Sequence, residues 1–135
     1  MHHEAWIKQA ESDISAAKLL SHQKFHSQAV WLSGQAVEKA HKAILAALGL
    51  RYEDRDYKKF GHTTNDISRL LPEALHEPVD PQVAKMLATL EARANASRYP
   101  AFSQGKFVPP TVSVTSSQQD VDDAQALVGW CQDRI

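Results

Sequence analysis

Apolar side chains recur at helical spacing along the first third of the chain. In residues 4–21 the apolar positions lie three or four residues apart, with polar residues between them. A second stretch with the same spacing runs from Phe25 or Ser27 to Leu48, where Gly49 is suited to a left-handed C-terminal cap. The pattern predicts two long amphipathic helices joined by a short turn.

A short helix and a longer one are predicted in the middle of the chain. Thr63 or Thr64 can cap the short helix, which carries apolar residues up to Pro72. Asp80 and Pro81 together give a strong start signal for the longer helix. An aspartate oxygen accepts hydrogen bonds from free amides there, and proline is favoured at the first helical position.

The last third contains a predicted loop and a final helix. Residues 98–117 include three prolines and a glycine without the alternation of a β-strand, so we expect a long loop. Ser117, with Asp120 three residues later, has the form of a capping box and is expected to open the final helix. These helices bury their apolar faces best as an up-and-down antiparallel bundle of four main helices plus one short helix. We therefore expect an all-α fold in which residues 1–135 form a single domain.

Composition limits the classes of function. Fifteen Lys and Arg oppose sixteen Asp and Glu, and the resulting net charge of -1 gives no overall attraction for nucleic acid or anionic membrane. No apolar run is long enough to span a membrane, and the N-terminus lacks the apolar core of a signal peptide, so we expect a cytoplasmic protein. Cys131 follows the apolar pattern of the final helix and is expected to be buried rather than reactive.

Sequence patterns typical of catalytic and cofactor sites are missing. The seven histidines are not spaced as metal ligands, and the five glycines are scattered singly rather than grouped in a phosphate-binding loop. No serine or cysteine nucleophile has local support. We therefore expect neither a metal nor an exchangeable cofactor.

A polar stripe on the second helix is the first candidate site. Gln35, Glu38, Lys39 and Lys42 follow the spacing i, i+3, i+4 and i+7, which places all four on one helix face. The simplest interpretation is an exposed surface with an ion pair between Glu38 and Lys42. The alternative is a binding site.

Two further features lie outside this stripe. His62 stands just before a predicted helix, where it can cap or orient the turn. Arg98, Tyr99 and Pro100 end the fourth helix, because proline forces an extended conformation on the residue before it. Each feature has a purely structural explanation when it is taken alone.

Taken in chain order, these features resemble the small prokaryotic HEPN domain. The resemblance rests on Trp6, Ala10, Asp13 and Ala17, on Gln35-Ala36-x-Glu38-Lys39-x-x-Lys42-Ala43, on Gly61-His62, on Arg98-Tyr99-Pro100 and on the helix that ends near Trp130. It spans nearly the whole chain, and its most specific part is the combination of the second-helix motif with G-H and R-Y-P. The family implies a compact helical bundle that is commonly a homodimer and is often encoded beside a minimal nucleotidyltransferase. Its members are proposed to bind nucleotides or, in some branches, to cut RNA.

The resemblance implies a nucleotide or RNA site. Its expected members are Gln35, Glu38, Lys39, Lys42, His62, Arg98 and Tyr99. The cations would donate to phosphate, the tyrosine would present a face to a base, and the remaining polar groups of the stripe would fix the orientation. Trp31 lies toward the edge of the stripe, and both a dimer-interface role and a stacking role are open for it.

HEPN ribonucleases resemble one another in an arginine followed after four to six residues by a histidine, placed late in the bundle. Neither Arg93 nor Arg98 is followed by such a histidine, while residues 55–62 and 69–76 fit the spacing but not the position. We therefore expect a non-catalytic protein that binds a nucleotide or RNA and partners a minimal nucleotidyltransferase in a toxin–antitoxin-like pair. The alternatives are a protein-interaction module that binds no nucleotide and, ranked last, a HEPN ribonuclease.

Overall fold

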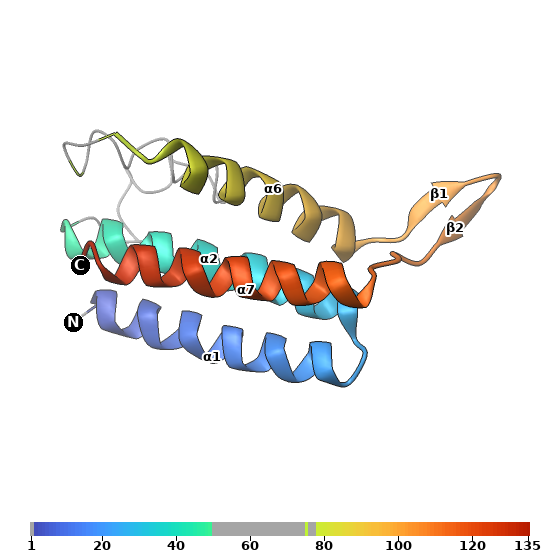
Figure 1. Ribbon diagram of the computed structural model, residues 1–135, viewed down its shortest axis with the longest axis horizontal. Coiled ribbons are helices and arrows are strands. Elements are labelled where there is room, and N and C mark those ends of the chain that lie inside the picture. Colours follow the sequence, from blue (N-terminus) through green and yellow to red (C-terminus); the bar gives the residue numbers. More distant parts are fainter. Residues whose placement is uncertain (1, 50–74, 76–77) are drawn as a thin grey trace.

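The computed structural model describes residues 2–49, 75 and 78–135, which form four long helices and one small hairpin (Figure 1). The elements are α1 (His2–His22), α2 (His26–Ala47), α6 (Pro81–Arg98), β1 (Ala101–Ser103), β2 (Lys106–Val108) and α7 (Val114–Gln132). The predicted all-α bundle is confirmed. The predicted short helix before Pro72 lies outside the described residues.

The four helices run up and down along one common direction (Figure 1). Helix α2 packs against each of the other three, and α7 also contacts α1 and α6. Figure 1 shows α1 and α6 on the outer sides of the bundle, with α2 and α7 between them. The start of α1 and the end of α7 lie at one end of the bundle, and the hairpin projects from the opposite end.

The apolar positions that predicted the helices form the core. One cluster joins all four helices and includes the buried residues Ile14, Ile44, Leu90 and Leu127. Cys131 belongs to the same cluster and is fully buried, and burial raises the pKa of its thiol to about 12. The prediction that this cysteine is a core residue is confirmed.

The predicted boundaries of α2 and the predicted start of α6 hold to within one residue. Gly49 follows α2 with a φ of 91°, which is the left-handed conformation expected of a C-terminal cap. Asp80 Oδ1 accepts a hydrogen bond of 2.7 Å from the amide of Gln82, and Pro81 is the first residue of α6. Tyr99 is extended and ends α6, because Pro100 follows it.

The predicted start of the last helix is wrong. Helix α7 begins at Val114, and the side chain of Ser113 caps it by accepting a hydrogen bond of 3.1 Å from the amide of Ser116. Ser117 and Asp120, the residues of the expected capping box, are instead buried inside the helix. Both side chains are used in contacts between helices rather than at a helix end.

The expectation of a continuous loop after α6 is also wrong. Strands β1 and β2 pair antiparallel, with Phe102 opposite Phe107. Gln104 and Gly105 join them with φ values of 50° and 80°, the pattern of a two-residue type I′ turn. The two phenylalanine rings pack edge to face with centroids 5.4 Å apart. The strands are only three residues long, so they leave little alternation in the sequence.

Candidate functional site

The polar stripe of α2 lies where α2 meets α1 and α6. Gln35, Glu38 and Lys39 are half-buried, and Lys42 is only 8% exposed. The interpretation of the stripe as an exposed surface is therefore wrong. The predicted ion pair within it is confirmed, because Lys42 Nζ lies 3.1 Å from Glu38 Oε1.

Lys39 is engaged by helix α1. Its Nζ atom lies 2.5 Å from Oδ2 of Asp13, a carboxylate that is only 6% exposed. Gln9 donates a second hydrogen bond of 3.0 Å to Oδ1 of the same carboxylate. The lysine thus neutralises a buried charge and ties α2 to α1.

Lys42 also points toward α1. Besides its ion pair with Glu38, its Nζ atom lies 5.2 Å from the ring centroid of Trp6, within the range of a cation–π contact. The two lysines of the stripe therefore lie on its α1 side. Trp6 and Asp13, two of the first-helix residues that carry the resemblance, are the groups that hold them.

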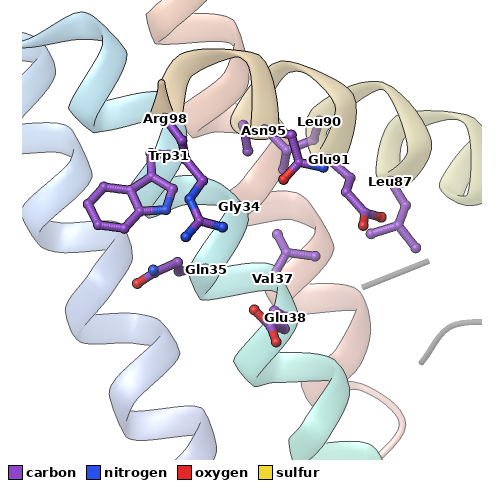
Figure 2. A pocket seen from close by; sticks show the side chains of 11 residues that line it. Trp31, Gly34, Gln35, Val37, Glu38, Leu87, Leu90, Glu91, Asn95 and Arg98 are labelled. Carbon is purple, nitrogen blue, oxygen red and sulfur yellow. The ribbon is translucent and has the colours of Figure 1, made fainter. Parts of the chain in front are cut away.

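A pocket of about 190 Å³ lies on the other side of the stripe, between α2 and α6 (Figure 2). It is lined by Trp31, Gly34, Gln35, Val37, Glu38, Leu87, Leu90, Glu91, Ala94, Asn95 and Arg98. Gln35, Glu38 and Arg98 are thus brought together, whereas Lys39, Lys42 and Tyr99 are not part of this lining. His62 lies outside the described residues.

Arg98 is an exposed residue of the pocket lining and lies near two aromatic rings. Its guanidinium carbon lies 5.7 Å from the ring centroid of Trp31 and 5.2 Å from that of Tyr99. Figure 2 shows the arginine reaching from α6 toward α2 beside Trp31. Both rings keep exposed surface, 37% for Trp31 and 64% for Tyr99. A cation and two accessible aromatic rings therefore converge at one place.

From the α6 side of the pocket, sequence reasoning found Arg98 and missed the other lining residues. Glu91 and Asn95 precede Arg98 by seven and three residues, so the three share one helix face. The same periodicity that identified the stripe on α2 would have found them. Gly34 was also missed, because the reason for a glycine there is the close approach of α6, which the sequence does not reveal.

A sequence model of the HEPN domain matches residues 3–133. The chain belongs to the HEPN domain family. Three solved structures have folds similar to that of this HEPN chain. A crystal structure of a protein from Thermus thermophilus has a TM-score of 0.83 and 20% sequence identity, with 100% of each chain covered.

The other two structures are described as HEPN proteins. An archaeal HEPN homologue has a TM-score of 0.67 and 25% identity, with 99% of this chain and 98% of that chain covered. An HEPN domain protein from Thermotoga maritima has a TM-score of 0.72 and 20% identity, with 98% and 96% covered. Among curated proteins, none is significantly similar in sequence to this chain.

The late arginines of this HEPN chain have other contacts. Arg93 Nε donates hydrogen bonds of 2.8 and 2.6 Å to the two carboxylate oxygens of Asp120, and no histidine follows Arg93 in the sequence. The Arg/His pairs at residues 55–62 and 69–76 lie outside the described residues. Within the described ranges no three metal-ligating side chains gather, and none of the helices there is long and apolar enough to cross a membrane.

Proposed function

We propose that this HEPN protein binds a nucleotide, free or at the end of an RNA, in the pocket between α2 and α6, without cutting it. The observation that carries this proposal is that Arg98, an exposed residue of the pocket lining, lies near both Trp31 and Tyr99. A guanidinium group binds phosphate oxygens through two parallel hydrogen bonds, and exposed aromatic rings stack on bases. A group that can bind phosphate and rings that can stack on a base therefore lie next to each other.

The orientation of the nucleotide follows from charge. Glu38 and Glu91 are half-buried residues of the pocket lining, so a phosphate group beside them would be repelled, whereas the exposed Arg98 attracts it. The lining also offers the amides of the half-buried Gln35 and the exposed Asn95, which both donate and accept hydrogen bonds, as base edges and ribose hydroxyls require. A cavity of about 190 Å³ suits a base rather than a whole nucleotide. We place the base inside and the phosphate outside.

The other expected site residues take different roles in this proposal. Lys42 acts indirectly, because it holds the carboxylate of Glu38 that faces the pocket. Lys39 stabilises the α1–α2 contact through Asp13 and does not bind phosphate. Tyr99 stacks on Arg98 or on the base, and His62 stays a prediction from the sequence.

Isothermal titration calorimetry with ATP, GTP and their monophosphates tests the pocket. Arg98→Ala removes a charge-assisted phosphate contact and should weaken binding by about 1 to 3 kcal/mol, or roughly 5- to 150-fold, without loss of helical content. Arg98→Lys should bind with intermediate affinity, because lysine keeps the positive charge but lacks the planar guanidinium group that donates two parallel hydrogen bonds. Lys85→Ala, an exposed residue near the start of α6, is the control. Absence of binding by the wild-type protein would favour the alternative, a protein-interaction module without nucleotide.

Assembly is the second part of the proposal. On the basis of family membership we propose a twofold homodimer that partners a minimal nucleotidyltransferase in a toxin–antitoxin-like pair. Light scattering should give twice the chain mass of 15.0 kDa at micromolar concentration. A mass of one chain across that range would argue against the homodimer. Co-expression with the nucleotidyltransferase encoded nearest to the gene would test the partnership by co-purification.

A further inference from the structure

Charge is distributed unevenly along the long axis of the bundle. Residues 14–37 and 92–119 contain no Asp or Glu, so all sixteen acidic residues lie in the rest of the chain. These two ranges comprise the second half of α1, the first half of α2, the end of α6, the hairpin and the start of α7. Figure 1 shows these parts meeting at one end of the bundle, which we call the hairpin end.

The basic residues of the hairpin end are Lys18, Lys24, Arg93, Arg98 and Lys106. Arg93 is neutralised by Asp120, which comes directly after the second range. The other four side chains are exposed. A protein with a net charge of -1 thus has a local surface of positive charge.

Exposed apolar side chains gather at the same end. Ten large apolar residues are exposed in the described part of the chain, and eight of them belong to the hairpin end. Five of these eight are aromatic: Phe25, Trp31, Tyr99, Phe102 and Phe107. Apolar patches of this kind on soluble proteins mark surfaces that bind another molecule.

The hairpin itself carries the most exposed of these rings. Phe102 and Phe107 are register partners, so both side chains lie on one face of the hairpin, and they are 67% and 72% exposed. All six residues of the two strands are exposed, and the hairpin projects away from the helices (Figure 1). A two-stranded hairpin of this length has little stability by itself, so a bound partner that covers the rings would stabilise it.

We infer that the hairpin end binds single-stranded nucleic acid. Phosphates lie against Lys24, Arg98 and Lys106, and bases stack on the rings of Phe102 and Phe107. Proteins that bind single strands without sequence preference combine these two features, a basic surface that follows the backbone and aromatic rings that stack on bases. The inference goes beyond the nucleotide pocket: the hairpin lines no part of that pocket, and Arg98 is the one residue named in both sites.

The geometry disfavours two other occupants. If the hairpin inserted into a membrane, the Gln104–Gly105 turn would enter first. Backbone N–H and C=O groups of a turn would then be buried in hydrocarbon without hydrogen-bond partners. A second copy joined by a twofold axis would bring two equally basic surfaces together. A polyanion with stacking bases complements both the charge and the rings.

Fluorescence anisotropy with labelled oligo(A) and oligo(U) RNA of about 12 nucleotides, within the usual site size, tests the inference. Phe107→Ala should weaken binding at least about fivefold, as expected for the loss of one stacked base, and Phe107→Trp should restore it. Lys106→Gln should weaken binding and reduce the slope of log K against log salt by about 0.7. Ile135→Ala and Lys8→Gln, at the opposite end of the bundle, are matched controls that should bind like the wild type.

Further measurements separate this surface from the pocket and from other partners. Gln35→Ala should lose mononucleotide affinity, and Phe107→Ala should still weaken RNA binding in the Gln35→Ala background, which isolates the hairpin from the proposed pocket. The inference fails if the wild type does not bind RNA at low salt, or if Phe107→Ala binds RNA as the wild type does. It also fails if Phe107→Ala halves the molecular mass in light scattering, or if phosphatidylserine vesicles bind the wild type and RNA does not compete.

Discussion

Gly34 in α2 lies directly against Ala94 in α6: a Cβ atom built on the glycine would lie 2.6 Å from the Cβ of the alanine. Carbon atoms of two side chains do not approach so closely, since their van der Waals contact is about 3.5 to 4.0 Å. The two helices that enclose the pocket therefore pack through a position where a side chain is excluded. Both residues also line that pocket.

Gly34→Ala should push α6 away from α2. We expect a loss of about 1 to 3 kcal/mol in the free energy of unfolding, as for other overpacked contacts, together with weaker nucleotide binding. Gly129→Ala in α7 is the matched control, because nothing lies within 4 Å of the Cβ it would add. That control should gain about 0.5 to 1 kcal/mol through helix propensity. Urea denaturation followed by circular dichroism measures both, and equal effects would contradict the close packing.

Lys39→Met should destabilise the protein without affecting nucleotide binding. The substitution leaves the buried Asp13 carboxylate without its cation, and we expect a loss of about 2 kcal/mol in the free energy of unfolding. The double variant Asp13→Asn/Lys39→Met should recover part of this loss, because no uncompensated charge is left. A variant that kept its stability and lost nucleotide affinity would instead make Lys39 a ligand, as the resemblance implies.

His41 should make stability depend on pH. Its ring is fully buried, Nδ1 lies 2.8 Å from the carbonyl oxygen of Val37, and burial lowers the pKa from 6.5 to about 4. Below pH 6.5 His41 is protonated in the unfolded chain, whereas in the folded chain it stays neutral down to about pH 4. Stability should therefore fall as pH drops through this window, by at most roughly 3 kcal/mol. His41→Gln should show a smaller difference between urea unfolding at about pH 4.5 and about pH 7, and an unchanged difference would exclude this role.

The purified protein should leave single-stranded RNA intact. The late arginine–histidine pair of HEPN ribonucleases is missing, since neither Arg93 nor Arg98 is followed by a histidine. Gel analysis of labelled RNA after overnight incubation checks this expectation. Cleavage that survives Arg98→Ala and disappears with His62→Ala would show that residues 55–62 form an active pair.

The helices could be predicted because their signals are local. Periodic apolar residues such as Ile14 and Ile44 mark the buried faces, and the cap formed by Asp80 depends on its immediate neighbours. The start of α7 could not be predicted, because Ser113 and Ser117 are equally good caps by sequence. Tertiary structure decides between them: the hydroxyl of Ser117 lies 2.8 Å from that of Ser21 in α1 and is unavailable at a helix end.

The site was only half predictable for a similar reason. Helical spacing placed Gln35, Glu38 and two lysines on one face of α2, but the partners of each side chain come from other helices. Asp13, which binds Lys39, precedes it by twenty-six residues in the sequence. The spacing along one helix identifies which side chains share a face, and the packing of neighbouring helices then divides them between two environments.

Both chain ends emerge where α1 begins and α7 ends, far from the hairpin (Figure 1). An affinity tag or a biotinylated peptide fused to either end would therefore attach the molecule to a sensor surface with its basic, aromatic end facing the solution. Fluorescent labels at the two ends would lie near each other and away from any bound strand. Kinetic measurements on immobilised protein would thus leave the hairpin unobstructed.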